Sequence, residues 1–276
     1  MAAVHRHSVT RAPLPGPRLA KPTQPPHPTP TTPAGRLLEA LARKGYRTVG
    51  LDLSAESLDF ARQRCRGLTP MPELHRGDMA VFDLGQARFA LAFNLVSSFK
   101  YLLDDRAAAS HLCCVYDALA PGGVYLLGLH VVDYEYHAEQ GDRERWHADA
   151  DGLAVDAKIF SSVPDPETRT ESVAAYLRVT RAPGDVQRLL CRFPMRTYDV
   201  AELFQLVRTC GRPFEVAEVY DFDYRPSDPR ENDDQLAVLL VLRRPQEGLG
   251  AGGDDGGGGG DAGARALATR LDAVAL

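Results

Sequence analysis

The sequence has few cysteines and no pair of them at metal-binding spacing. Five cysteines occur in 276 residues, and none stands in a Cys-x-x-Cys motif. An odd number without that spacing argues against a disulfide framework and against a zinc site. We therefore expect free thiols, mostly buried, as suits the reducing cytoplasm.

No hydrophobic run is long enough to cross a membrane. The longest, Leu236–Leu242, is the size of a strand, whereas a spanning helix needs roughly 20 residues. The N-terminal residues are basic, with no acidic residue before Glu39. They lack the apolar core of a secretory signal and the serine richness and amphipathic periodicity of a transit peptide. We predict a cytoplasmic protein without a membrane partner.

An excess of positive charge is also missing. The formal net charge is −5, and no run of Lys and Arg forms a basic stripe. A nucleic-acid partner would call for such a clustered basic surface. We therefore expect no nucleic-acid partner.

Low-complexity segments are present at both ends. Residues 1–33 hold nine of the twenty prolines, and proline fixes φ and donates no backbone hydrogen bond. The sequence predicts a disordered, Pro-rich leader there, without a sheet strand. Residues 244–276 contain the glycine run Gly256–Gly260, which predicts a flexible tail. One folded domain is expected between them, over residues 34–243.

Strands and helices alternate through the first part of this domain. Such alternation is typical of right-handed βαβ units and a parallel sheet. The predicted fold class is α/β: a three-layer sandwich with a mostly parallel, doubly wound sheet. Strands are expected at 47–53, 74–76, 89–96 and 124–129, and helices at 37–42, 55–66 and 104–119.

The rhythm changes after residue 130. Three strand-like runs, 153–163, 172–181 and 187–193, follow one another with turn residues but no helix between them. They predict that residues 153–193 form an antiparallel sheet that covers the ligand crevice, within an insert over residues 131–197 on the substrate side of the fold. A helix over 199–210 and two strands, 214–222 and 235–243, then close the domain as an antiparallel pair.

Acidic residues follow two of the predicted strands. Asp52 stands at the end of one strand, in Gly-Leu-Asp-Leu-Ser, where a carboxylate can accept from both hydroxyls of a ribose. Asp78 follows the next short strand in Gly-Asp-Met, where it can accept from the exocyclic amine of an adenine. Each also has a plainer interpretation, because Asp favours helix N-caps and Gly-Asp is common in turns.

Two further motifs complete the pattern. Polar residues, beginning with Asn94, stand where the apolar strand 89–96 stops, and such positions face the ligand crevice of doubly wound sheets. Leu-Ala-Pro-Gly-Gly, at 119–123, turns a helix back into the sheet.

In this order and spacing, the motifs resemble those of class I, S-adenosylmethionine-dependent methyltransferases over residues 35 to about 243. The resemblance implies S-adenosylmethionine as the cofactor and a small-molecule methyl acceptor as the partner. It implies that Asp52 holds the ribose hydroxyls, Asp78 the adenine amine, and Met79 the ring face. The implied cofactor-binding residues are Gly35, Asp52, Leu53, Asp78, Met79 and Asn94.

One part of the family pattern is missing. Members of the family begin with an apolar strand that runs into an acidic, glycine-rich loop, and here only Ala34-Gly35-Arg36 matches the end of that loop. Glycine lets the backbone approach the ligand, and the loop leads to a helix N-terminus that favours an anion. We therefore predict six sheet strands in place of seven and impaired cofactor binding.

Candidate catalytic groups are few. His130 and Asp133 follow the strand at 124–129, and His130 could act as a general base on an amine or hydroxyl. Tyr101, Tyr134, Tyr136 and Trp146 could line an acceptor pocket or simply pack. Two other functions stay open: a non-catalytic methyltransferase-like binding module, and a nicotinamide-dependent oxidoreductase, against which the absent G-x-G-x-x-G counts.

Overall fold

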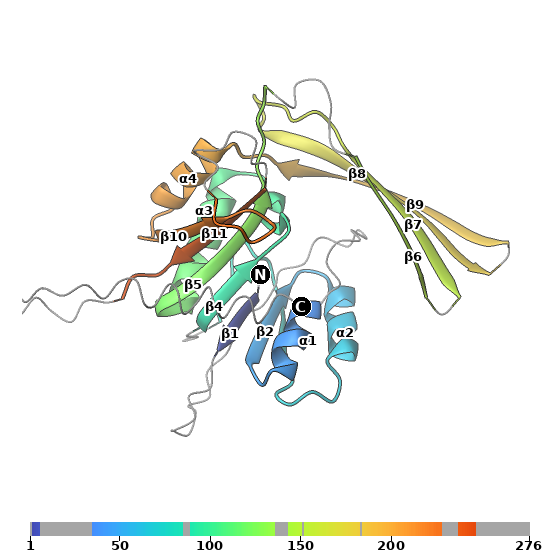
Figure 1. The fold of residues 1–276 in the computed structure, drawn as a ribbon, viewed down its shortest axis with the longest axis horizontal. Helices are drawn as coiled ribbons and strands as arrows, with labels where there is room; N and C mark the ends of the chain where they lie inside the picture. Colours follow the sequence, from blue (N-terminus) through green and yellow to red (C-terminus); the bar gives the residue numbers. More distant parts are fainter. Residues whose placement is uncertain are drawn as a thin grey trace, which may run out of the picture.

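A seven-stranded sheet forms the centre of the molecule in the computed structural model (Figure 1). The structure describes residues 2–5, 35–84, 89–135, 143–150, 152–182, 184–227 and 237–246. The strands of this sheet are β1 (Ala2–His5), β2 (Arg47–Asp52), β3 (Glu73–Arg76), β4 (Phe89–Asn94), β5 (Leu119–His130), β10 (Glu215–Tyr220) and β11 (Ala237–Arg243).

The strand order is β10-β11-β5-β4-β1-β2-β3. β2 pairs with β3 and β4 pairs with β5 in parallel. β1 runs antiparallel to both of its neighbours, and β11 runs antiparallel to β5 and to β10. Five strands therefore share one direction, which confirms the mostly parallel sheet and the antiparallel pair at its end.

The prediction of six strands was wrong. A strand over Ala2–His5 fills the place between β2 and β4, with Ala3 opposite Ala92 and His5 opposite Arg47. The prolines of the leader begin only at Pro13, so the residues before it keep the N–H donors that a ladder needs. The remaining leader residues, 6–34, and the predicted tail beyond residue 246 lie outside the described residues.

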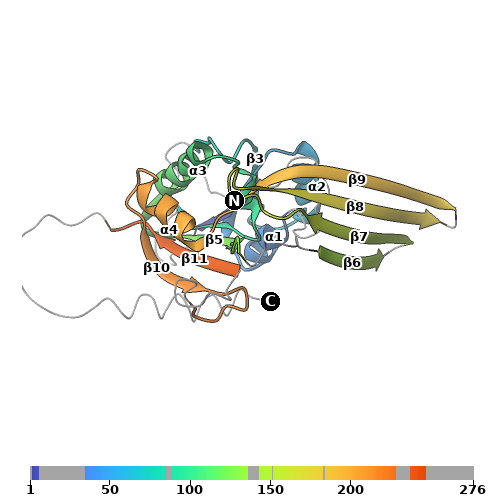
Figure 2. The same ribbon diagram turned by 90° about the horizontal axis from the view of Figure 1, so that it is seen from above.

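Helices cover both faces of the sheet, as the predicted three-layer sandwich requires (Figures 1 and 2). On one face, α1 contributes Leu38 and Leu41 to a cluster with Phe93 and Leu126. On the other face, the cluster combines side chains of α3 and α4 with those of the sheet, such as Tyr125 and Leu240. The four helices are α1 (Arg36–Arg43), α2 (Ala55–Arg64), α3 (Asp105–Ala118) and α4 (Val200–Thr209).

Side-chain caps fix where three helices begin. The Ser54 hydroxyl accepts from the Ser57 N–H before α2, and the Asp104 carboxylate accepts from the Ala107 N–H before α3. Asp199 forms a reciprocal capping box with Glu202 at the start of α4. Each cap satisfies a backbone donor that the first helical turn leaves open.

Gly123 lets β5 follow α3 without a loop. A Cβ at this position would lie 2.8 Å from the carbonyl oxygens of both Ala120 and Phe89. Neighbouring Gly122 has φ 76°, in the left-handed region. The Pro-Gly-Gly sequence therefore allows the close approach of β4 that a side chain would block.

The predicted insert is a second, four-stranded antiparallel sheet. Its order is β6-β7-β8-β9, so each strand pairs with the next along the chain. The three predicted strands are confirmed, and a fourth precedes them. We expected this sheet to cover the ligand crevice. It projects instead beyond the α/β body (Figures 1 and 2). Its strands are β6 (Arg143–Ala150), β7 (Leu153–Ser161), β8 (Thr170–Ala182) and β9 (Asp185–Arg196).

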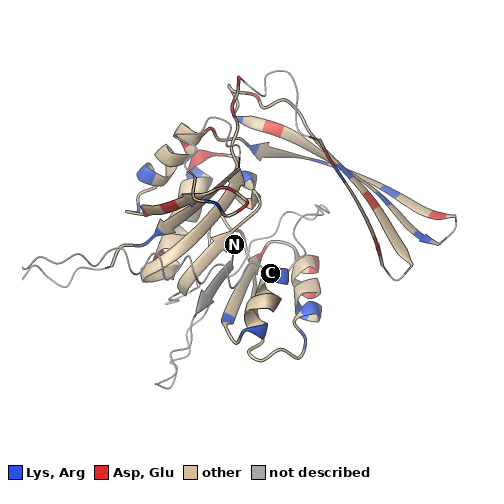
Figure 3. Cartoon of the chain, viewed as in Figure 1, with Lys and Arg blue, Asp and Glu red and all other residues tan. Residues whose placement is uncertain are grey.

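One face of this sheet is apolar, because successive side chains of a strand point to opposite faces and the apolar ones share one face. Val173, Ala175 and Leu177 of β8 are buried on that face. Near the body, Val173 and Phe193 pack with Tyr101 of the 3-10 helix η1 (Ser98–Tyr101). Figure 3 shows that charged residues of both signs occur along the projecting strands.

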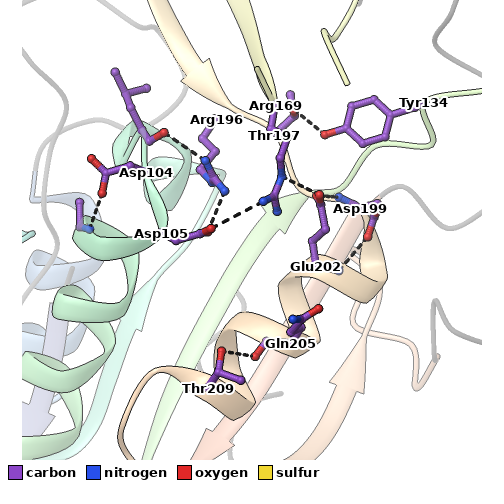
Figure 4. A network of polar contacts seen from close by, with 12 residues as sticks. Asp104, Asp105, Tyr134, Arg169, Arg196, Thr197, Asp199, Glu202, Gln205 and Thr209 are labelled. Atoms are coloured by element: carbon purple, nitrogen blue, oxygen red, sulfur yellow. Dashed lines mark hydrogen bonds and ion pairs between the residues drawn. The ribbon is translucent and has the colours of Figure 1, made fainter. Parts of the chain in front are cut away.

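Ion pairs tie the base of the insert to the body (Figure 4). Arg196, at the end of β9, contacts the Asp105 carboxylate at 2.7 Å and donates to the Leu103 carbonyl at 3.2 Å. Arg169, just before β8, contacts Glu202 of α4 at 2.5 Å. These contacts fix the root of the insert against the starts of α3 and α4.

No helix of the described residues is long and apolar enough to span a membrane.

Candidate functional site

The ends of the parallel strands meet at one edge of the sheet. β2 ends at Asp52, β3 at Arg76, β4 at Asn94 and β5 at His130. In open α/β sheets this carboxyl edge is where ligands bind. The edge therefore holds most of the sequence-predicted residues.

Asp52 is buried at the end of β2. Asp52 is 2 % exposed, and its Oδ1 accepts from the Ser54 N–H at 2.9 Å. This contact turns the chain from β2 toward α2, so part of the plainer, structural interpretation holds. Leu53, between them, is 46 % exposed, and its carbonyl accepts from Arg76 Nε at 3.2 Å.

The loop after β3 is fixed on the end of β2. The Gly77 N–H donates to the Asp52 carbonyl at 2.9 Å. A Cβ on Gly77 would stand 2.8 Å from Leu51 Cδ1, so the two chains approach more closely than a side chain allows. The ends of β2 and β3 thus form one continuous surface.

Asp78 lies exposed in this loop. Its Oδ1 accepts from the Ala80 N–H at 2.8 Å, which closes a turn. Because this bond engages one oxygen, the exposed carboxylate keeps acceptor capacity toward solvent. Met79 follows, half-buried, with its sulfur 3.9 Å from Asn94 Nδ2.

Asn94 is fully buried, and its side chain points into the core on the α3 face. Its Nδ2 lies 3.9 Å from the Met79 sulfur, and the side chain interacts with the polar hydroxyl of Tyr125. Asn94 Oδ1 is buried with no hydrogen-bond partner among the described residues. The amide thus joins the end of β4 to the Gly-Asp-Met loop.

A strained turn follows β4. Val96 and Ser97 have φ values of 58° and 61°, a conformation that costs on the order of 1–3 kcal/mol for each such residue and is least tolerated by β-branched side chains. The Ser97 N–H donates to the Gly128 carbonyl at 2.9 Å, which holds the turn against β5. Strain of this kind clusters at functional sites.

This turn brings Ser97 to His130. Ser97 Oγ accepts from the His130 backbone N–H at 3.0 Å and lies 3.0 Å from His130 Nδ1. The exposed imidazole also packs edge-on against Phe222, with ring centroids 4.8 Å apart. His130 is therefore held at the mouth of the edge by β4, β5 and the segment after β10.

Gly35 has a packing role at the start of α1. Its φ is 79°, and a Cβ there would stand 2.8 Å from Ala61 Cβ of α2. It therefore sets the approach of α1 to α2, while the acidic and amide residues form a separate, connected group.

Comparison with a protein-family model finds a methyltransferase domain over residues 32–123. The sheet ends in an antiparallel strand pair, β10 and β11, as the sequence predicted. The chain has the class I methyltransferase fold. A search of curated proteins finds no match.

Solved structures with this fold include three bacterial methyltransferases. The CcbJ methyltransferase of Streptomyces caelestis is 21% identical with a TM-score of 0.59, over 74% of this chain and 77% of its own. An S-adenosylmethionine-dependent methyltransferase of Clostridium acetobutylicum ATCC 824 is 16% identical with a TM-score of 0.57, over 71% and 74%. The sugar N-methyltransferase KedS8 of Streptoalloteichus sp ATCC 53650 is 18% identical with a TM-score of 0.54, over 72% and 71%.

The aromatic candidates of this methyltransferase-fold chain do not form one group. Tyr101 packs on Phe193 at the root of the insert, with ring centroids 5.6 Å apart. Tyr134 bonds Thr197 Oγ1 at 2.9 Å, also at the root (Figure 4). Trp146 lies on β6 of the insert, and Tyr136 lies outside the described residues. Asp133 accepts from the Glu135 N–H in a local turn.

Sequence reasoning missed His111 of α3. It is fully buried, and its ring nitrogens lie 2.9 Å from the Met79 carbonyl oxygen and 2.8 Å from the Tyr125 hydroxyl. Burial lowers its pKa to about 3. The only sequence signal is a histidine on the apolar face of a helix, which is also typical of an ordinary core residue.

Within the described residues, no group of three or more His, Cys, Asp and Glu side chains is placed to hold a metal ion.

Proposed function

We propose that this chain transfers a methyl group from S-adenosylmethionine to a small-molecule acceptor and holds the cofactor chiefly through its adenosine half. One observation carries the proposal. Within the class I order, the carboxylates of Asp52 and Asp78 stand on two neighbouring strand ends joined by the Gly77–Asp52 hydrogen bond.

The residues present fit an adenosine. A ribose offers two vicinal hydroxyl donors to Asp52, and the adenine amine offers a donor to the exposed Asp78 carboxylate. The half-buried Met79 supplies a soft, polarizable surface for the ring face. The nucleoside would thus be recognised by three residues from two adjacent loops.

The methionine half of the cofactor has less support. Residues 1–34 contain no acidic, glycine-rich loop, and β1 runs opposite to the strand that precedes such a loop in the family. Near the end of β4, the buried Asn94 Oδ1 is an acceptor that no described residue satisfies, but its side chain points into the core. We infer that this half adds little to binding.

His130 is the proposed base. When bound, the cofactor supplies an electrophilic methyl group, and the protein must align an acceptor and remove its proton. Nε2 of His130 can take a proton only if Nδ1 carries the ring hydrogen and donates it to Ser97 Oγ. Ser97 Oγ is able to accept that hydrogen, and the strained turn that carries Ser97 fixes the place of the imidazole.

The insert would choose the acceptor. Its root, with Tyr101 and Tyr134, lies beside the segments that follow β4 and β5. An amine on a sugar is the first acceptor class to try, because a solved neighbour of the same fold is a sugar N-methyltransferase. An amine also matches a site with a single proposed base.

Calorimetry with adenosine and S-adenosylhomocysteine tests how the cofactor is held. We expect both ligands to bind with affinities within roughly threefold of each other, because the contacts belong to the shared half. Guanosine is the control ligand and should bind far more weakly. If neither adenosine nor S-adenosylhomocysteine binds, the proposed function is wrong; if S-adenosylhomocysteine binds over about 100-fold more tightly, the methionine half is held after all.

A second candidate is a binding module without catalysis. The reversed β1 and the missing loop favour it, because a methyl group held from one end is poorly aligned and a misplacement of about 1 Å can cost on the order of 100-fold in rate. Formation of S-adenosylhomocysteine with a panel of amino sugars separates the two. Turnover that falls in His130→Gln supports the enzyme; adenosine binding with no turnover on any acceptor favours the module.

A further inference from the structure

Met79 is held at two points by a closed ring of hydrogen-bonding groups. Its carbonyl oxygen lies 2.9 Å from His111 Nδ1, and its sulfur lies 3.9 Å from Asn94 Nδ2. Tyr125 lies between the other two: its hydroxyl is 2.8 Å from His111 Nε2 and interacts with the polar side chain of Asn94. Residues from α3, β4 and β5 therefore meet on one residue of the Gly-Asp-Met loop.

Chemistry leaves one arrangement of hydrogens in this ring. A carbonyl can only accept, so His111 Nδ1 carries the hydrogen and donates to Met79. Nε2 is then a bare acceptor and receives the Tyr125 O–H.

The surroundings keep this arrangement intact. His111 is 0 % exposed, and Phe82, Phe99 and Tyr125 contact its ring with centroid distances of 6.3, 5.5 and 5.8 Å. In such an apolar enclosure an unpaired polar group is costly, so all members of the ring must stay bonded. The imidazole is neutral because burial lowers its pKa to about 3.

Space filling does not explain the arrangement. A phenylalanine would fill the same enclosure without two polar atoms that need partners. The Met79 carbonyl is the part of the ring that belongs to the loop, and the exposed Asp78 directly precedes Met79 in the sequence. Movement of this carbonyl would move the carboxylate that faces solvent.

We propose that His111 is a positioning residue for a purine nucleoside: through the Met79 carbonyl it sets the Gly77–Ala80 loop, so that Asp78 meets the amino group of adenine. This inference rests on the proposed function, and it assigns adenine selectivity to a side chain that does not touch the ligand. Asp78, which would contact the base, and His111, which would position Asp78, then lie on different sides of the loop.

The test compares adenosine with inosine, which carries an oxo group where adenosine carries the amine. In the full-length protein we expect adenosine to bind more tightly than inosine by roughly tenfold or more, since a charged acceptor would face an oxygen in inosine. Three variants follow: His111→Asn, whose amide nitrogen can take the place of Nδ1, His111→Gln, whose amide reaches the Nε2 position, and His111→Phe. Titration calorimetry gives both affinities for each variant.

The matched pair His111→Asn and His111→Gln decides the outcome. We expect His111→Asn to keep the adenosine preference and His111→Gln and His111→Phe to lose it, to within about twofold of equal binding. Equal weakening of both nucleosides, with the preference unchanged, would show that His111 is only structural. Wild-type protein that binds neither nucleoside would instead refute the proposed function.

Thermal unfolding of every variant accompanies the titrations. If His111→Gln and His111→Phe do not fold, Tyr125→Phe replaces them, because it keeps the imidazole but removes the hydroxyl that holds Nε2 in place. A reduced adenosine preference in Tyr125→Phe supports the proposal, and an unchanged preference overturns it.

Discussion

Lys100 and Glu171 form a buried ion pair that joins the body to the insert. Lys100 Nζ lies 2.5 Å from Glu171 Oε1, and the two side chains are 6% and 7% exposed. Lys100 belongs to η1, just after β4, whereas Glu171 is the second residue of β8. The body and the insert are therefore joined by an ion pair that is shielded from water.

This buried pair predicts that substitutions of Lys100 and Glu171 change the free energy of unfolding by large, non-additive amounts. Lys100→Met leaves the Glu171 carboxylate buried and unpaired, and should lower the free energy of unfolding by about 3–5 kcal/mol. The double variant Lys100→Met/Glu171→Leu should recover most of that loss, because a hydrophobic pair avoids both desolvation costs. Urea denaturation of the two singles and the double measures the coupling.

An exposed pair gives the matched control. Arg62 and Asp59 approach to 2.5 Å on α2 with side chains 48% and 66% exposed. Arg62→Ala should change stability by less than about 1 kcal/mol. Additive effects of Lys100→Met and Glu171→Leu would contradict the assigned role of the buried pair.

Among the glycines of the described residues, Gly123 is the position where we expect an added methyl group to lower stability most. In Gly123→Ala the new Cβ would stand 2.8 Å from two carbonyl oxygens, on Ala120 and Phe89, and main chain cannot move aside as a side-chain tip can. We expect a loss of about 1–3 kcal/mol in stability from the forced separation of β4 and β5. Thermal unfolding would show it, with Ala120→Gly as a variant that adds no atoms; an unchanged midpoint would show that β5 can shift.

Local sequence patterns predicted most of the elements because their signals are local. The Asp104 and Asp199 caps, the apolar stretch of β4 and the Pro-Gly-Gly turn each act within a few residues. β1 was missed because a high proline content was assigned to the whole leader, whereas the prolines begin at Pro13. The pairing of Ala2 with Phe93 also joins residues 91 positions apart, which no local pattern encodes.

Some residues of the candidate site could likewise be predicted from local sequence, whereas others could not. Asp52 and Asp78 stand at predictable strand ends, so their places at the sheet edge could be predicted. The contact of His111 with Met79 joins residues 32 positions apart, and a lone histidine in an apolar stripe gives no hint of its partner. The projection of the insert depends likewise on distant anchors such as Arg196 and Asp105.

Stability should depend on pH through His111. Burial lowers its pKa to about 3 in the folded protein, from an ordinary 6.5. Between these values the unfolded chain binds a proton that the folded protein does not, so stability falls as the pH falls, by up to about 1.4 kcal/mol per pH unit. Above about pH 6.5 this contribution is fully present and constant.

Removal of the histidine isolates this dependence. His111→Phe should lose less stability than the wild type when the pH drops from about 7.5 to about 5, the difference being about 2 kcal/mol. Urea denaturation at the two pH values measures it. Parallel losses in both proteins would mean that other groups account for the acid sensitivity and that His111 titrates normally.

Asp52 offers a test that separates binding from folding. Its Oδ1 already accepts from the Ser54 N–H, so a substitution acts on the turn before α2 as well as on any ribose. Asp52→Asn keeps an acceptor for Ser54 but removes the charge. We expect it to weaken adenosine binding by roughly 10- to 150-fold, the worth of a hydrogen bond to a charged group. With 2′,3′-dideoxyadenosine, which lacks both hydroxyls, wild type and variant should bind alike. A loss of similar size for both ligands would mean that Asp52 acts only by shaping the loop; calorimetry with the two nucleosides on the two proteins completes the cycle.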